Sequence, residues 1–257
     1  MPDLHASGEK PLVDAHCHIG PCPSGNLKID RLIKEMGQNA VSLALVSPAR
    51  ADDAIAIANA NNTIRKAVNR FPDRIVGLGA VRPQETAEAC EEAERARDKG
   101  LHGLKVRPIP GDFHLTRNQL VPIAEKALEL GQFLYIQSGS RLSPILKETA
   151  ALARKFPELH IIFSFRKSPP VETFPPDEQL EPENLLFDTS SLKSENLTML
   201  FHKIGKRRLV FGSGFPFGSQ RVELSKAYRA ISSEAVPFVY SQNICSVLCD
   251  CGINIPA

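Results

Sequence analysis

The sequence predicts one (β/α)8 barrel of the α/β class, on three observations. Eight short apolar segments rich in β-branched residues recur along the chain, as expected for buried parallel strands. Successive segments begin 23 to 34 residues apart, which leaves room for one helix and two loops in each interval. A chain of 257 residues has the usual length of such a barrel. The predicted strands are residues 12–18, 41–47, 75–82, 101–107, 133–140, 159–166, 185–191 and 208–216.

Helical patterns fill most of the intervals between these strands. Residues 53–71 carry apolar side chains at helical spacing, and residues 85–98 are rich in Ala and Glu, which favour helices. Thr116 and Gln119 have the spacing of a capping box at a helix start. Glycines stand where three helices should end, at Gly100, Gly131 and Gly205.

The interval between the sixth and seventh predicted strands is different. It holds five prolines, which remove backbone donors and interrupt helices. We predict an irregular loop or lid there in place of a full helix. The prolines are Pro169, Pro170, Pro175, Pro176 and Pro182.

Composition and charge indicate an ordinary globular protein. Hydrophobic residues make up 42% of the chain and charged residues 23%, so a sizeable core is available. We predict a barrel domain over residues 11–257 and a flexible polar tail over residues 1–10. The net charge of +2 argues against a nucleic-acid or membrane partner. A homodimer is compatible with the sequence.

Neither a signal segment nor a membrane span is visible in the sequence. The first ten residues lack an apolar core, and no run approaches the length that crosses a bilayer. We therefore expect a cytoplasmic protein whose six cysteines are thiols. Cys245, Cys249 and Cys251 could bind a metal, but their spacing favours a helix face packed in the core.

Two histidines end the first predicted strand. His16 and His18 are two residues apart, so in a strand both imidazoles lie on one face and point at one place. Neutral histidine is the commonest nitrogen ligand of zinc-like ions, and the pair is therefore a candidate divalent metal site. The alternative is a metal-free pair that is hydrogen-bonded inside the barrel mouth to Asp188 or Gln137.

Cations outnumber carboxylates at the predicted strand ends, where barrel enzymes carry their active sites. Lys105 and Arg107 are two residues apart and could both point at a bound carboxylate or phosphate. Arg82 and Arg166 end the third and sixth predicted strands. The partner that this pattern predicts is a small anionic ligand, although such charges can also form salt bridges or face solvent.

Four motifs together resemble a known family. They are residues 14–18 (DAHCH), 103–105 (GLK), 184–190 and 212–217 (GSGFPF), and the resemblance covers residues 12 to about 250. The chain is similar to the amidohydrolase-related (amidohydrolase 2) family of the amidohydrolase superfamily. These proteins are metal-dependent TIM-barrel hydrolases and decarboxylases of small carboxylated substrates. The resemblance implies that His16 and His18 hold a divalent metal.

The chain departs from the family pattern at three positions. Gln137, Phe165 and Gly214 stand where the family usually has a histidine, often a second histidine, and a metal-binding aspartate. A zinc site normally needs three protein ligands, so His16 and His18 alone form a weak, incomplete site. Lys105 could be a carboxylated bridging ligand of a two-metal relative or an ordinary charged side chain.

Two functions therefore remain open. In the first, the chain is an enzyme with an eroded metal site, in which His16, His18 and Asp188 are catalytic. The residues expected to bind its substrate are Lys105, Arg107, Arg82, Gln137 and Arg166. In the second, the same barrel is a non-catalytic binder of an anionic metabolite or a scaffold. A carboxylate that reaches the histidine pair favours the enzyme.

Overall fold

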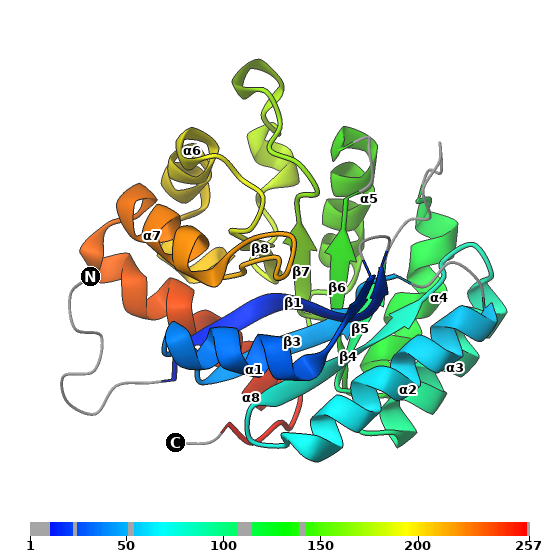
Figure 1. Cartoon of the computed structure of the whole chain (residues 1–257). Helices are drawn as coiled ribbons and strands as arrows, with labels where there is room; N and C mark the ends of the chain where they lie inside the picture. The colour runs from blue at the N-terminus through cyan, green and yellow to red at the C-terminus, as the bar shows by residue number, and fades with distance from the viewer. Residues whose placement is uncertain (1–10, 23–24, 51–53, 107–114, 139–141, 256–257) are drawn as a thin grey trace.

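The computed structural model describes residues 11–22, 25–50, 54–106, 115–138 and 142–255. Its centre is a curled nine-stranded sheet with the order β2-β1-β3-β4-β5-β6-β7-β8-β9, and helices lie outside it (Figure 1). The strands are β1 (Val13–Cys22), β2 (Gly25–Leu27), β3 (Leu43–Pro48), β4 (Ile75–Val81), β5 (Gly103–Val106), β6 (Phe133–Gln137), β7 (Ile161–Ser164), β8 (Leu185–Asp188) and β9 (Leu209–Val210).

All eight predicted strands are present, and the predicted α/β fold of the TIM-barrel type is confirmed. Every neighbouring pair from β1 and β3 to β8 and β9 is parallel. The sequence did not predict β2, which pairs antiparallel with the end of β1 and lengthens it into a hairpin. The backbone N–H groups of Ala15 and His18 donate to the carbonyl oxygens of Phe211 and Phe215, at 2.8 Å each, and so link β1 to the segment after β9.

The helices follow the strands in the predicted order. Residues 54–70 and 86–98 are helical, and the side chain of Gln119 accepts a hydrogen bond from the backbone N–H of Thr116 at 3.0 Å. None of the helices in the described ranges is long and apolar enough to cross a membrane. The helices are α1 (Ile29–Gln38), α2 (Ala54–Arg70), α3 (Thr86–Asp98), α4 (Arg117–Glu129), α5 (Leu142–Lys155), α6 (Ser194–Ile204), α7 (Gln220–Ala230) and α8 (Asn243–Asp250).

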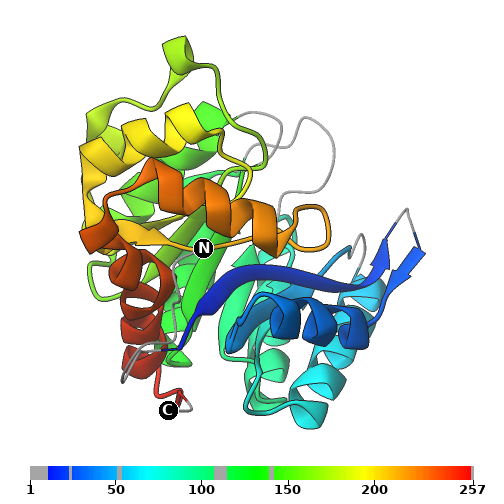
Figure 2. The same cartoon turned by 60° about the vertical axis from the view of Figure 1, so that its left-hand side comes forward.

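The proline-rich segment between β7 and β8 lacks an α-helix, as predicted. All of its residues are described, and it contains only two short 3-10 turns, η1 (Val171–Thr173) and η2 (Asp177–Gln179). Figure 2 shows it rising above the rest of the molecule. The shorter helical turns elsewhere are η3 (Lys206–Arg208), η4 (Ser233–Ala235) and the π-helical η5 (Phe238–Gln242).

The core has an inner and an outer part. Inward side chains of the strands form one buried cluster with Ile244, Val247 and Leu248 of α8, which packs against the interior of the sheet. Outward side chains of the strands pack against the surrounding helices in two further clusters. Burial of these apolar side chains is the main favourable contribution to folding.

A bulge in β1 directs the two histidines inward. The register between β1 and β3 shifts between Asp14 and Cys17, and bulges of this kind turn side chains next to functional sites. Cys17 then packs outward among residues of α1 and α2, while His16 faces the interior. The two-residue spacing places the histidines on one face of the strand, and the bulge makes that face the inward one.

Asp14 occupies the outward side of this bulge and is fully buried. Its Oδ1 accepts hydrogen bonds from the backbone N–H groups of His16 and Ser213, at 3.1 and 2.9 Å. Its Oδ2 accepts bonds from Ser213 Oγ at 2.6 Å, from Gln220 Nε2 at 2.8 Å and from Cys17 Sγ at 3.1 Å. One carboxyl group thus joins β1, the segment after β9 and α7.

We expect Asp14→Ala to lower the free energy of unfolding by about 3 to 5 kcal/mol, because it leaves several buried donors unpaired. Asp14→Asn keeps one acceptor oxygen and should fall between this variant and the unchanged protein. The control is Asp30→Ala, which breaks an exposed ion pair with Arg70 and should cost less than about 1 kcal/mol. Urea denaturation measures all three, and equal losses for Asp14→Ala and Asp30→Ala would contradict the role given to Asp14.

Candidate active site

The candidate site lies at the carboxyl ends of the strands, where His16 and His18 come together. Their ring centroids are 4.7 Å apart and both side chains are buried. Ser47, at the end of β3, contacts His18 Nδ1 through its Oγ at 3.0 Å. The ring of Phe217 lies 5.8 Å from the ring of His18, and its side chain is largely exposed.

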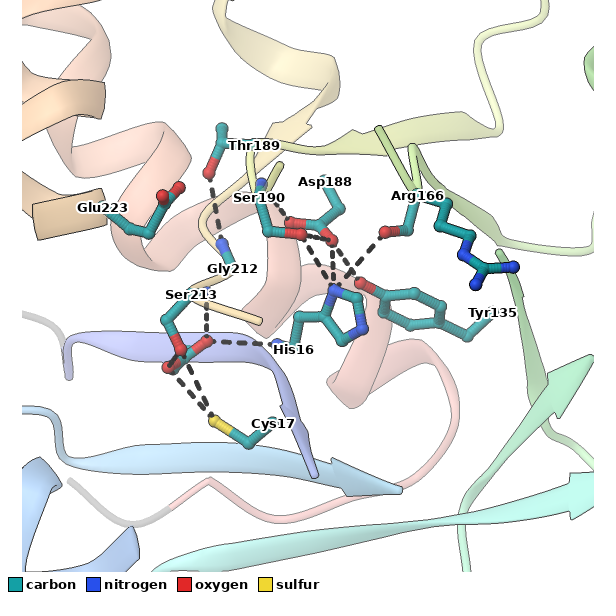
Figure 3. Close-up of polar contacts among 12 residues, drawn as sticks. His16, Cys17, Tyr135, Arg166, Asp188, Thr189, Ser190, Gly212, Ser213 and Glu223 are labelled. Atoms are coloured by element: carbon teal, nitrogen blue, oxygen red, sulfur yellow. Dashed lines mark hydrogen bonds and ion pairs between the residues drawn. The ribbon is translucent and has the colours of Figure 1, made fainter. Parts of the chain in front are cut away.

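Asp188, the last residue of β8, is the carboxylate that reaches the histidine pair. Its Oδ2 lies 2.6 Å from His16 Nδ1. Oδ2 also accepts hydrogen bonds from the hydroxyl of Tyr135 at 2.8 Å and from Ser190 Oγ at 2.6 Å. Oδ1 accepts a hydrogen bond from the backbone N–H of Ser190 at 2.7 Å. Figure 3 shows these groups converging on the ring of His16, while Cys17 points away from it.

Gly212 allows this close packing. A Cβ atom at that position would stand 2.1 Å from Asp188 Oδ1 and 2.8 Å from the Cβ of His16. Contacts this short are not tolerated between non-bonded atoms, so any larger residue would displace the carboxylate. The position of Asp188 therefore explains why the first residue of the 212–217 motif, Gly212, is a glycine.

Lys105, on β5, reaches the other nitrogen of His16. Its Nζ lies 3.2 Å from His16 Nε2 and 3.6 Å from the centre of the Tyr135 ring. The lysine is 2% exposed, so its charge sits inside the protein. The sequence predicted that Lys105 faces the barrel mouth, but not that it contacts His16.

The two contacts of His16 assign its proton. Burial and the positive charge of Lys105 lower the pKa of His16, and Asp188 opposes them only in part, so the imidazole is neutral. Burial alone would raise the pKa of Asp188, but the hydrogen bonds that it accepts from the His16 ring and from Ser190 hold that pKa well below its usual range. A neutral ring that donates from Nδ1 to Asp188 and accepts at Nε2 from Lys105 satisfies both partners.

Tyr135 completes the inner face of the site. Burial and the neighbouring Asp188 raise the pKa of its hydroxyl well above the ordinary value, so the group stays protonated and donates. Its ring lies 5.3 Å from the ring of His16, and the Nζ atom of Lys105 lies over its face, 3.6 Å from the ring centre. The sequence analysis missed this residue, although its alternation with Gln137 on β6 places both on one strand face.

The other residues predicted to bind the substrate are Arg107, Arg82, Arg166 and Gln137, and those that the structure describes have different surroundings. Arg107 falls outside the described residues. Arg82 pairs with Glu85 at 3.2 Å and lines a small cavity of about 30 Å³ with side chains of α2 and α3. Arg166 is exposed, and its backbone N–H donates to Ser138 Oγ. Gln137 is half-buried, and its Oε1 is a buried acceptor without a hydrogen-bond partner among the described residues.

The structure corrects the position assigned to the family's second histidine. Phe165 faces outward and packs against the rings of Phe163 and Phe187, at 5.3 and 6.2 Å, so it cannot replace a site residue. The inward position at the end of β7 is Ser164, whose Oγ lies 3.4 Å from His16 Nδ1. Strand alternation from Ile162 would have identified it.

The described residues do not fit a tightly held metal. No three His, Cys, Asp or Glu side chains in the ranges given above come together as a metal group. Both ring nitrogens of His16 are engaged, and a cation at Nε2 would have to displace the ammonium group of Lys105. Gly214 contributes no side chain where the family has its aspartate.

The carboxyl-terminal cysteines lie on α8 and directly after it, at Cys245, Cys249 and Cys251. Cys245 and Cys251 pack against the inner cluster of the core, and Cys249 is exposed. Burial raises the pKa of Cys251 to about 11. Packing, the interpretation favoured by their spacing, is confirmed for Cys245 and Cys251 and is wrong for Cys249, whose side chain is exposed.

Solved structures with the same fold were found by comparison. A 2,6-dihydroxybenzoate decarboxylase from Rhizobium is 18% identical, with a TM-score of 0.70 over 93% of this chain and 98% of that chain. A 5-carboxyvanillate decarboxylase from Sphingomonas paucimobilis is 16% identical, with a TM-score of 0.70 over 93% and 99% of the two chains. The corresponding enzyme of Novosphingobium aromaticivorans, solved with manganese and 4-hydroxy-3-methoxy-5-nitrobenzoic acid, is 16% identical, with a TM-score of 0.70 over 94% and 96%.

Sequence comparison gives the family directly. The family profile described as amidohydrolase matches residues 13–164, which include β1 with the histidine pair, Lys105 on β5 and all of β7. These are more than half of the 257 residues of the chain. The match contains the first two of the four sequence motifs, residues 14–18 and 103–105, and the chain belongs to the amidohydrolase family.

Proposed function

We propose that this protein is a decarboxylase-type enzyme that acts on a small carboxylated substrate and does not depend on a tightly held metal. The observation that carries the proposal is the buried chain of contacts from Asp188 through His16 to Lys105. It joins a carboxylate, an imidazole and an ammonium group at the carboxyl ends of three strands. Such a set can bind an anion and move a proton.

The presence of Asp188 beside the histidine pair favours an enzyme over a passive binder. A site built only to hold an anion needs cations and donors, whereas Asp188 adds a buried negative charge. Its hydrogen bond to Nδ1 orients the ring and stabilises an imidazolium that forms when Nε2 takes up a proton. The decarboxylases named above act on aromatic acids, which agrees with a carboxylated substrate here.

The remaining residues have matching roles in the proposal. The ammonium group of Lys105 would attract the substrate carboxylate. The Oε1 of Gln137, which has no hydrogen-bond partner among the described residues, would accept a hydrogen bond from a hydroxyl group of the substrate. The ring of His18, whose Nδ1 contacts Ser47, lies beside that of His16 and would form a second wall of the substrate site.

Gly214 supports the second candidate function, a non-catalytic metabolite binder. The family aspartate at this position accepts a proton during catalysis, and glycine cannot. The test is release of carbon dioxide from a panel that includes 2,6-dihydroxybenzoate and short 3-oxo acids, with chelator-treated protein. Release above the rate in buffer supports the enzyme, whereas ligand binding without release supports the binder.

We expect purified protein to carry well under one equivalent of zinc, iron or manganese per chain, because too few ligands converge on one point. Elemental analysis after dialysis measures this content. A near-stoichiometric metal that survives dialysis would contradict the proposal and would require Lys105 to move away from His16.

The double substitution Gly214→Asp with Gln137→His should raise metal affinity by about tenfold or more, since it restores a carboxylate and an imidazole. Gly214 has a φ of +66°, a conformation that aspartate and asparagine tolerate better than most residues, and a Cβ there has room. The matched control is Gly214→Asn with Gln137→His, which makes the same backbone demand without the charge. Equal zinc or manganese uptake by the two folded variants, measured by calorimetry, would show that the position of Gly214 is unsuitable.

Removal of the lysine should weaken anion binding. We expect Lys105→Ala to reduce affinity for a carboxylated ligand by about 1.5 to 3 kcal/mol, the range for a hydrogen bond to a charged group. The control is Lys34→Ala, an exposed lysine of α1, which should leave affinity unchanged. Calorimetry with 2,6-dihydroxybenzoate and acetoacetate makes the comparison, and binding that is insensitive to Lys105→Ala would count against the site.

A further inference from the structure

Asp188, His16 and Lys105 are arranged as an orienting acid, a base and a nucleophile. The base lies within hydrogen-bond distance of both partners, at 2.6 Å from the carboxylate and 3.2 Å from the amine. This is the geometry by which proteins activate a weak nucleophile for covalent catalysis. Lysine amines in enzymes form imines with the carbonyl groups of substrates.

We propose that Lys105 forms an imine with the ketone of a small 3-oxo acid, and that this imine accepts the electron pair of the carbon–carbon bond that breaks in decarboxylation. The inference rests on the proposed function and deepens it by naming the substrate class and the covalent step. It also explains how a decarboxylase can work on this barrel without a metal: a protonated imine supplies the positive charge that a metal ion would otherwise supply.

The surroundings of Lys105 suit a cationic imine. The face of the Tyr135 ring, 3.6 Å from Nζ, attracts a positive charge whether it is an ammonium or a protonated imine. The Nζ atom lies 3.2 Å from His16 Nε2, a ring nitrogen that can take up a proton. The 2% exposure of Lys105 also limits its reaction to molecules that enter the site.

The reaction balances without an oxidant or a metal. Lys105 passes a proton to His16, and its nitrogen forms a bond to the ketone carbon while the C=O π bond breaks. The former ketone oxygen takes one proton back from His16 and a second from the attacking nitrogen, and it leaves as water, so that a protonated imine remains. The bond to the carboxylate then breaks, carbon dioxide leaves, and the electron pair moves through the new C=C bond to the imine nitrogen. A proton returns to carbon, and water hydrolyses the imine to release the ketone and the free amine.

The test is reductive trapping of the full chain with acetoacetate and sodium borohydride. We expect loss of activity only when both reagents are present, with a mass gain that corresponds to a reduced adduct of acetoacetate or of its product acetone. Digestion should place that adduct on Lys105, where trypsin no longer cleaves. Lys105→Met should lose both the adduct and carbon dioxide release, while Lys34→Met should keep both.

A second variant separates the base from the nucleophile. His16→Asn retains the amine, and we expect the rate of adduct formation at Lys105 to fall by about 100-fold or more. Thermal denaturation checks that each variant is folded. If the adduct forms on Lys105 of His16→Asn at the unchanged rate, His16 is not the base that takes the proton of the amine.

The outcomes distinguish this inference from the proposed function. Carbon dioxide release that resists borohydride, or that survives in folded Lys105→Met, would overturn the imine and leave the decarboxylase function in place. An adduct on Lys105 without carbon dioxide release would support the imine and contradict the decarboxylase function. Neither adduct nor release with any 3-oxo acid or aromatic acid would overturn both.

Discussion

The buried carboxylate of Asp188 is the constraint on which the site depends. Removal of a negative charge from water is costly, and the cost is offset here by donors from His16, Tyr135 and Ser190. Those bonds fix the plane and the tautomer of the imidazole, and the tautomer determines that Nε2 is an acceptor. Lys105 contacts Nε2 as a result. The sequence of carboxylate, imidazole and ammonium group across the site therefore depends on Asp188 at the end of β8.

Backbone structure makes this arrangement possible at two points. The bulge in β1 sends Asp14 outward and His16 inward, although they are only two residues apart. The absence of a side chain at Gly212 lets Asp188 approach. Two buried carboxylates therefore lie on opposite sides of β1. On the outward side, Asp14 binds the segment after β9 and α7, and on the inward side Asp188 orients the ring of His16.

The sequence predicted the fold well because its signals were local and agreed with one another. All eight strands were placed, as were the start of α4 at Thr116 and the proline-rich segment that replaces a helix. The site was predicted less completely, because contacts such as that between Lys105 and His16 join residues 89 positions apart. Phe165 was misassigned because a comparison of flanking residues does not register strand alternation, and the bulge in β1 has no clear sequence signal.

The two-sided construction of β1 has a consequence for how such proteins diverge. Polar groups that hold the barrel together lie on the outward side of the strand, and those that could do chemistry lie on the inward side. A lineage can therefore exchange the inward set, including the groups that hold a metal, without loss of the interactions that keep the chain folded. Proteins with very different reactions, or with none, can then share one backbone.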